Sequence, residues 1–183
     1  FNDLSLFGHH FEPLQLAFVP LYFLAPSPVT LLVVQALILA LGAVPLYWMA
    51  RQRLPDYIHL WAVFPIAYLM FAPLRAVNRF DYHPGALAVT PFLFALYFME
   101  RSRWSIMILF LVMAGLLKEN MPAAGVTVGL YLIIAKRRRV LGAIVALAFG
   151  LWFYAGFTWI IPAFNPWGYG FFHNYAGMGD SMS

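Results

Sequence analysis

The chain has 183 residues, of which 63% are hydrophobic, 19% are aromatic and only 10% are charged. Soluble domains carry roughly 25% charged and 45–50% apolar residues. This composition, with a mean hydropathy of +0.79, therefore excludes a soluble globular enzyme and a disordered segment. The net charge is +4, but the basic residues form short clusters between apolar runs, as in membrane proteins and unlike a nucleic-acid-binding face. Without cysteine there is no disulfide and no thiolate metal site.

Apolar runs, taken in chain order, predict an all-α, polytopic transmembrane helix bundle. A helix needs about 20 apolar residues to cross the hydrocarbon core of a bilayer. The runs that we interpret as spans number six: 29–50, 57–74, 85–99, 104–117, 121–135 and 140–161. They are continuously apolar and lack the alternation of a membrane β-barrel strand.

A further apolar run, 14–24, precedes these spans. Its 11 residues cover roughly 17 Å as a helix, whereas the hydrocarbon core is about 30 Å thick. Prolines flank the run on both sides, and Pro20 interrupts it. We therefore expect an interfacial or re-entrant helix on the outer face rather than a seventh span.

Basic turns set the expected orientation. The turns at 51–53, 101–103 and 136–139 hold eight of the eleven Lys and Arg residues, and alternating spans place all three on one side. The positive-inside rule assigns that side to the cytoplasm, where these residues set topology and contact anionic membrane lipids. Segments 1–28 and 162–183 are then extracytoplasmic loops. We interpret 1–183 as a single integral-membrane domain, and as part of a longer protein because it opens in a loop-like stretch.

Most residues able to do acid–base or ligand chemistry fall on the opposite side. Lys118, Glu119 and Asn120 separate two spans that are too short to cross fully as straight helices. The two charges are therefore expected below the outer interface, facing a cavity or a partner. The alternative is a snorkelling Lys118 beside a carboxylate in a tight turn.

A second cluster lies in the predicted outer loop 75–84, which prolines bracket and separate from the helices on either side. Arg75 and Arg79 can hold a phosphate group. Asp81 and His83 share a face of an extended segment, either as a base and its orienter or as two metal ligands. The alternative is an Arg79–Asp81 surface pair without chemistry.

A third cluster comprises His9, His10 and Glu12, just before a proline that can open the short helix. The His-x-x-Glu spacing brings two ligand types together on a turn, so a divalent metal is one interpretation. A hydrogen-bonded histidine is the other, because there is no HExxH helix and no third ligand at fixed spacing. His173 lies in the Gly- and aromatic-rich segment 165–175, which fits either an interfacial belt or a cover over a lipid or sugar ligand.

These clusters resemble, in order, three motifs of a bacterial family of predicted multi-spanning membrane proteins, domain of unknown function 2079. The family carries a His-Phe-Ser-Pro-like, a Phe-Asp-Phe-His-Pro-Glu-like and a Lys-Glu-Asp-like motif. Here they read GHHFEP at 8–13, FDYHP at 80–84 and LKEN at 117–120. The family's apolar span ending in Leu-Ala-Arg reads PLYWMAR at 45–51.

The chain departs from the family pattern at three positions. Glu12 stands where Ser is usual, Gly85 where Glu is common, and Asn120 where Asp is common. Two family acids are therefore missing, which weakens the expectation that this copy is catalytically competent.

The family is distantly similar to the GT-C glycosyltransferases, which take a sugar from a polyprenyl-phosphate carrier. The resemblance implies an enzyme of the bacterial inner membrane whose usual catalytic acid, in the first outer loop, precedes this chain. On the enzyme hypothesis the catalytic residues of this chain are Asp81, His83 and Glu119: Asp81 or Glu119 would orient or deprotonate the acceptor hydroxyl, with His83 or His10 assisting. The residues that it implies for substrate binding are Arg75, Arg79, Lys118, Asn120, His10 and His173. No metal ligand is assigned and no cofactor is required, although a divalent ion can assist.

The rival hypothesis is a non-catalytic transmembrane subunit that packs against other integral membrane subunits. Short, aromatic-rich spans and 13 glycines offer packing surfaces, and the missing family acids fit a copy without chemistry. A transporter is a weaker option, because proline-broken spans suit it but no internal repeat does. The expected partners are membrane lipids, the lipid-linked sugar donor and other membrane subunits, with no nucleic acid.

Overall fold

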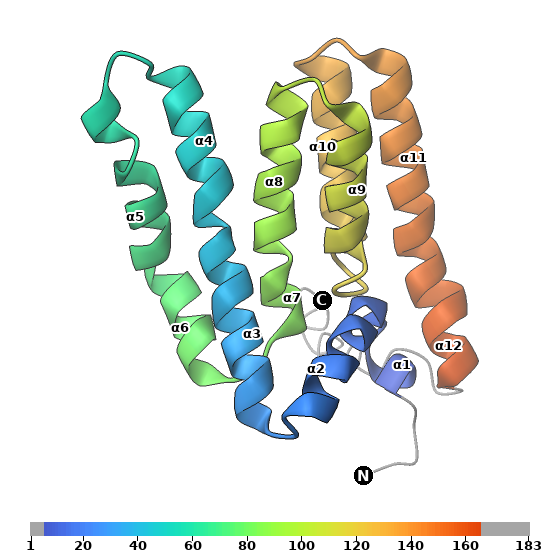
Figure 1. Ribbon diagram of the computed structural model, residues 1–183. Coiled ribbons are helices and arrows are strands. Elements are labelled where there is room, and N and C mark those ends of the chain that lie inside the picture. Colours follow the sequence, from blue (N-terminus) through green and yellow to red (C-terminus); the bar gives the residue numbers. More distant parts are fainter. Residues whose placement is uncertain (1–5, 166–183) are drawn as a thin grey trace, which may run out of the picture. The chain divides into compact units, whose positions relative to one another are not determined.

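The computed structural model describes residues 6–165, and every regular element within them is a helix (Figure 1). The all-α prediction is therefore confirmed for this part of the chain. The contacts divide the chain into two compact units, one made of residues 1–13 and 118–183 and the other of residues 14–117. We call them the terminal unit and the central unit. That both belong to a single integral-membrane domain stays a prediction.

The central unit holds most of the helices. After the 3-10 helix η1 (Pro13–Phe18), which begins at the unit boundary, its elements are α2 (Val19–Leu24), α3 (Pro28–Leu41), α4 (Ala43–Arg53), η2 (Ile58–Leu60), α5 (Val63–Met70), α6 (Ala72–Phe80), α7 (Pro84–Leu87), α8 (Val89–Glu100) and α9 (Trp104–Gly115). The described elements of the terminal unit are α1 (Leu6–His9), α10 (Pro122–Ile134), α11 (Arg139–Ala155), the π-helical turn η3 (Gly156–Ile160) and α12 (Ile161–Phe164).

Within residues 6–165, two helices are long and apolar enough to cross a membrane. Pro28–Arg53 combines α3 and α4, and Arg139–Phe164 combines α11, η3 and α12; each has 26 residues. At 1.5 Å per residue each measures about 39 Å, which exceeds the roughly 30 Å of hydrocarbon. The first begins where the Ser27 hydroxyl accepts a hydrogen bond from the Val29 N–H at 3.3 Å, an N-cap followed by proline. The predicted spans 29–50 and 140–161 are confirmed as membrane-capable helices.

The predicted span 57–74 differs from the structure. It is broken into Ile58–Met70 and Ala72–Phe80, which meet at a 44° bend and together form either a third, broken span or a re-entrant loop. Pro73 lies in the first turn of α6, where its missing N–H costs no helical hydrogen bond, so it opens a helix. The prediction of a loop at 75–84 is therefore wrong for residues 75–80, which are helical.

The remaining apolar helices are shorter, with 10–17 residues each: Pro13–Leu24, Pro84–Glu100, Trp104–Gly115 and Pro122–Ile134. The short helix predicted at 14–24 is confirmed, and it does begin at a proline. Its location at the membrane interface stays a prediction.

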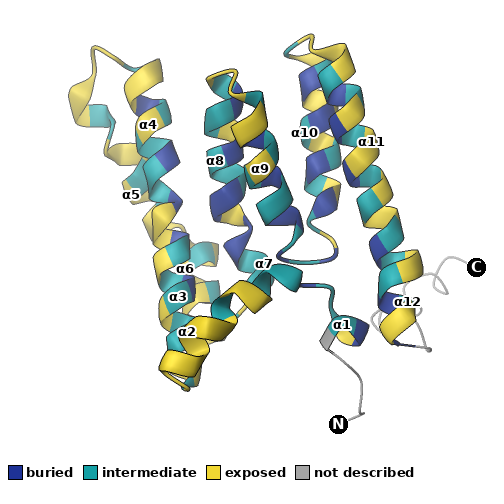
Figure 2. Cartoon of the chain, turned by 45° about the vertical axis from the view of Figure 1, so that its right-hand side comes forward, coloured by how far each residue is buried: buried dark blue, intermediate teal, exposed yellow. Residues whose placement is uncertain are grey.

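The surface of α11 carries a stripe of exposed apolar side chains (Figure 2). Val140, Ile144, Leu147 and Leu151 recur at helical spacing, and each is between 59% and 75% exposed. A soluble protein would bury such a stripe, whereas in a bilayer it faces lipid tails as apolar as itself. This pattern fits a helix in contact with lipid.

Small residues let α10 and α11 approach closely in the terminal unit. A Cβ on Gly129 would lie 2.5 Å from the Ala146 backbone nitrogen, and one on Gly142 would lie 2.5 Å from the Gly129 carbonyl oxygen. Close backbone contact through small residues is the usual way in which membrane helices associate. This hairpin therefore depends on glycine at both positions.

In the central unit, an ion pair of 2.6 Å joins Arg53 to Glu100. Arg53 ends α4 and Glu100 ends α8, so the predicted basic turns 51–53 and 101–103 lie at the same end of this unit. This agrees with the expectation from alternating spans.

Candidate functional site

The backbone of the first segment of the site is fixed by aromatic and glycine contacts. Phe7 packs against the rings of Phe11 and Phe164, with ring centroids 5.9 and 5.6 Å apart. A Cβ on Gly8 would lie 2.8 Å from the Phe164 carbonyl oxygen, and the Asn165 amide donates a 3.1 Å hydrogen bond to the Gly8 carbonyl. The chain between α1 and η1 is thereby held against the end of α12.

The second segment is the turn that precedes α10. The Met121 N–H donates to the Lys118 carbonyl at 3.0 Å, and the helix then starts at Pro122. Within this turn Glu119 is buried, Lys118 is partly buried and Asn120 is exposed. The predicted burial of Glu119 is confirmed.

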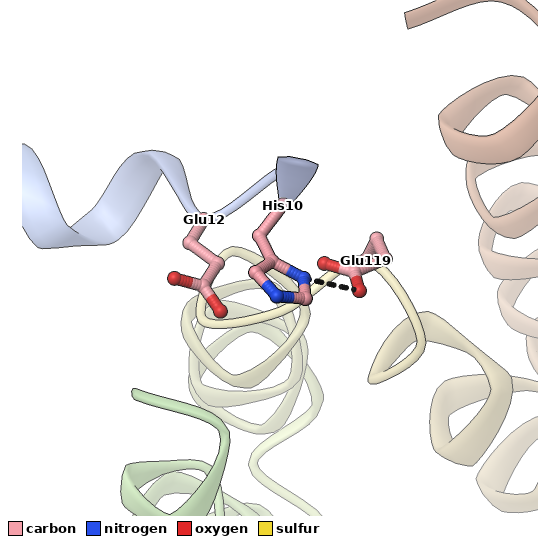
Figure 3. A group of neighbouring side chains, drawn as sticks. All are labelled: His10, Glu12 and Glu119. Atoms are coloured by element: carbon pink, nitrogen blue, oxygen red, sulfur yellow. Dashed lines mark hydrogen bonds and ion pairs between the residues drawn. The ribbon is translucent and has the colours of Figure 1, made fainter. Parts of the chain in front are cut away.

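The two segments bring His10, Glu12 and Glu119 together, as Figure 3 shows. The His10 Nδ1 lies 3.0 Å from Glu119 Oε1, and the Phe11 N–H donates to Glu119 Oε2 at 3.2 Å. One ligand atom from each of the three side chains lies within 4.8 Å of the other two. We call these three residues the His10–Glu12–Glu119 cluster.

Burial differs among the members of this cluster. The Glu119 side chain has no exposed surface, Glu12 is 4% exposed, and the His10 side chain is 26% exposed. The imidazole is therefore the member that an approaching molecule meets. Two buried carboxyl groups beside one imidazole can accept a proton, orient a base or ligate a cation.

The cluster lies far from the basic turn 136–139 of the same unit. Helix α10 separates Glu119 from that turn, and its 13 residues measure about 20 Å. The acidic and basic ends of this unit are therefore apart, as the charge pattern of the sequence predicted.

In the central unit, buried Gln35 fixes the predicted Asp81–His83 segment. Its side-chain amide donates to the Asp81 carbonyl at 3.0 Å and accepts from the His83 N–H at 2.7 Å. Gln35 precedes Arg51 by 16 residues in one continuous helix, so about 24 Å separates this segment from the basic end. Sequence reasoning missed Gln35, although a primary amide inside an apolar span is itself a signal of a buried polar contact.

The side chains of Asp81 and His83 do not pair with each other. The Asp81 carboxylate accepts from the Tyr82 N–H at 2.7 Å, and the His83 Nδ1 lies 3.1 Å from the Asp81 carbonyl oxygen. Both residues are exposed. Their assignment as catalytic residues stays a prediction, but a direct base–orienter bond between the two side chains is absent.

Arg75 and Arg79 lie four residues apart on α6, and so on one face of that helix. Both are exposed, and Arg75 and Asn78 line a hollow of about 120 Å³ beside α3. Arg79 and Asp81 do not form the ion pair that was the alternative interpretation of this cluster. Phosphate binding at this face stays a prediction.

The remaining predicted residues are accounted for as follows. Lys118 forms no ion pair with any residue in the range 6–165.

His9, the neighbour of His10, is exposed and is not part of the cluster. His173 lies outside the described residues. What sequence reasoning missed is that Glu119 joins Glu12 and His10, because 109 residues separate His10 from Glu119.

The comparisons with known proteins give one match. A family model described as predicted membrane protein (DUF2079) matches residues 1–183. No curated protein and no solved structure matches the chain. An all-helical chain with membrane-capable helices and the three ordered motifs agrees with that description. The chain therefore belongs to the DUF2079 family of predicted membrane proteins.

Proposed function

We propose that the chain belongs to an integral membrane glycosyltransferase of the GT-C type, which transfers a sugar from a polyprenyl-phosphate carrier at the extracytoplasmic face. The observation that carries the proposal is the His10–Glu12–Glu119 cluster. It is an acid–base group with two buried carboxylates, next in sequence to a lysine, in a chain that is 63% hydrophobic. Ionisable groups at membrane depth are costly, and they normally mark a functional site.

The proposed topology has six spans in the bacterial inner membrane, with the basic turns in the cytoplasm. In this topology the two 26-residue helices and the bent pair are three of the spans, and the shorter apolar helices Pro84–Glu100, Trp104–Gly115 and Pro122–Ile134 are the other three. About 20 Å of helix separates Glu119 from the basic turn 136–139, and about 24 Å of helix separates Gln35, which binds the Asp81–His83 segment, from Arg51. This separation supports an outer site opposite cytoplasmic arginines.

In the proposed reaction, the oxygen of an acceptor hydroxyl attacks the anomeric carbon of the donor sugar. The bond from that carbon to the phosphate oxygen breaks, and polyprenyl phosphate leaves with one more negative charge. The hydroxyl proton passes to the His10–Glu119 pair, in which the buried carboxylate orients the imidazole. Lys118, next to Glu119, offers a cation for the phosphate. Asn120 and His173 are proposed to contact the sugar or the acceptor.

The test is sugar transfer by the purified full-length protein, with a panel of radiolabelled sugars on polyprenyl phosphate. We expect His10→Gln and Glu119→Gln to lower the rate by about 100-fold or more, the usual contribution of a general base. The controls His9→Gln and Glu100→Gln should stay within about twofold, because neither residue belongs to the cluster.

Full activity of both cluster variants would contradict the proposed site. Wild-type protein that transfers no sugar from any donor, and that copurifies stoichiometrically with other membrane subunits, would favour the non-catalytic role. Arg79→Ala and Asp81→Ala in the same assay test the residues predicted in the central unit.

A further inference from the structure

The His10–Glu12–Glu119 cluster has the composition of a metal site. One imidazole and two carboxylates, from two segments of the same unit, offer three ligand atoms within 4.8 Å of one another. Exposed acidic pairs are common on protein surfaces, but both carboxylates here belong to residues that are at most 4% exposed. Buried charges of this kind are normally paired or bound to a metal.

The distances fit a single ion. Ligand atoms about 2.1 Å from one ion lie roughly 3.0 Å apart at a right angle and about 4.2 Å apart when opposite each other. The His10 Nδ1 to Glu119 Oε1 distance of 3.0 Å is that of two adjacent ligands. A separation at the 4.8 Å limit would have to shorten by about 0.6 Å for ligands opposite each other, and by about 1.8 Å for ligands at a right angle.

The negative charges of the two carboxylates also favour a bound cation. Two ionised carboxylates this close together repel each other strongly in a poorly hydrated site. A divalent cation held between the two carboxylates would offset this repulsion, since bound cations are often the largest local charges in such a site.

We propose that the His10–Glu12–Glu119 cluster binds one divalent transition-metal ion of the Mn²⁺ or Zn²⁺ class. Imidazole together with carboxylates suits these ions, whereas Ca²⁺ and Mg²⁺ prefer all-oxygen sites. Three protein ligands leave a position open for a substrate oxygen, whose hydroxyl proton the ion makes more acidic. The inference rests on the proposed function and concerns the same site: in the ion-bound protein His10 and Glu119 act as ligands, and the ion takes over from the His10–Glu119 pair the activation of the acceptor hydroxyl.

The test is metal binding by the full-length protein, stripped with EDTA and then titrated separately with Mn²⁺, Zn²⁺, Ca²⁺ and Mg²⁺. We expect one Mn²⁺ or Zn²⁺ per chain in the wild type. Replacing a direct ligand should weaken binding by about 100-fold, at least as much as the loss of an outer partner does. The ligand variants are His10→Gln, Glu12→Gln and Glu119→Gln.

His9→Gln is the matched control, since it removes an adjacent imidazole that lies outside the cluster and should leave the affinity unchanged. Pulsed electron paramagnetic resonance of Mn²⁺ bound to the His9→Gln protein should show coupling to an imidazole nitrogen. This spectrum keeps the test decisive even if the ligand variants fail to fold. Absence of stoichiometric binding, absence of nitrogen coupling, or equal affinities of His9→Gln and His10→Gln would overturn the proposal.

The outcomes separate this inference from the proposed function. Ion binding at the cluster without sugar transfer from any donor supports the metal site and contradicts the enzyme assignment. Sugar transfer that survives EDTA, in protein that binds no ion, contradicts the metal site and leaves the enzyme assignment standing.

Discussion

The Glu119 carboxylate has no exposed surface, and both of its oxygens take part in hydrogen bonds, one with the His10 ring and one with the Phe11 N–H. Glu119→Ala removes both contacts and leaves the partly buried Phe11 N–H without this acceptor. We expect a loss of roughly 1–3 kcal/mol in the free energy of unfolding, measured by denaturant titration in detergent micelles.

Glu100→Ala is the control for this experiment, because the Arg53–Glu100 pair is 70% and 22% exposed at its two side chains. Exposed pairs contribute about 0–1 kcal/mol. Equal effects of the two substitutions would contradict the structural role of Glu119.

Gln35 is fully buried, and its amide bonds with the backbone on both sides of Tyr82. Gln35→Leu keeps the volume but leaves the His83 N–H and the Asp81 carbonyl without this partner, at a cost of about 1–3 kcal/mol. Hydrogen exchange should show a faster-exchanging His83 amide. Gln52→Leu changes an exposed residue of the same long helix and should leave that amide unchanged. Unaltered exchange in Gln35→Leu would show that the segment is held by other contacts.

For individual residues, the sequence predicted which residue types the site contains, but not which of them contact one another. His10 and Glu119 were both candidates, each from its own local cluster. Their pairing depends on tertiary contacts across 109 residues, for which no local periodicity exists. Glu12 was interpreted only with its sequence neighbours, and the third ligand that the interpretation lacked is Glu119.

At the scale of elements, the α10–α11 hairpin gives a sharp contrast between two glycines. A Cβ at Gly129 meets the Ala146 backbone at 2.5 Å, whereas one at Gly150 meets only a Val126 methyl group at 3.8 Å. Gly129→Ala should therefore lower the free energy of unfolding by about 1–3 kcal/mol through overpacking. Gly150→Ala should be neutral or stabilising, because alanine is the better helix former. Thermal unfolding in detergent measures the difference. Equal unfolding temperatures for the two variants would contradict this packing.

The predicted helices differ in how well the sequence determined them. The two 22-residue charge-free runs at 29–50 and 140–161 are helical although Pro45 and several glycines lie within them, because a helix satisfies the backbone hydrogen bonds of a continuously apolar segment internally. Residues 75–80 were interpreted as a loop because they are charged and follow a proline. Pro73, however, opens α6, and the spacing of Arg75 and Arg79 is that of one helical face.

For the whole molecule, composition and the family match agree on a membrane protein, and charge asymmetry organises each unit in the same way. In the terminal unit, α10 runs from the His10–Glu12–Glu119 cluster to the basic turn 136–139. In the central unit, the long helix runs past the Asp81–His83 segment to Arg51 and Arg53. The positions of Lys and Arg in the sequence predicted this asymmetry, because the positive-inside rule does not depend on how the helices pack.

The central claim is that the His10–Glu12–Glu119 cluster opens on the membrane face opposite the basic turns. Because residues 1–183 contain no cysteine, a single cysteine introduced there is the only thiol within this range, and the unsubstituted protein shows the labelling of any other thiol. Asn120→Cys marks the turn beside Glu119, and Ala135→Cys marks the other end of α10; both positions are exposed. Intact spheroplasts are treated with a membrane-impermeant thiol reagent. We expect this reagent to label Asn120→Cys directly, and to label Ala135→Cys only after the membrane is permeabilised. Labelling of both cysteines from the same side, or of Ala135→Cys alone, would contradict the central claim.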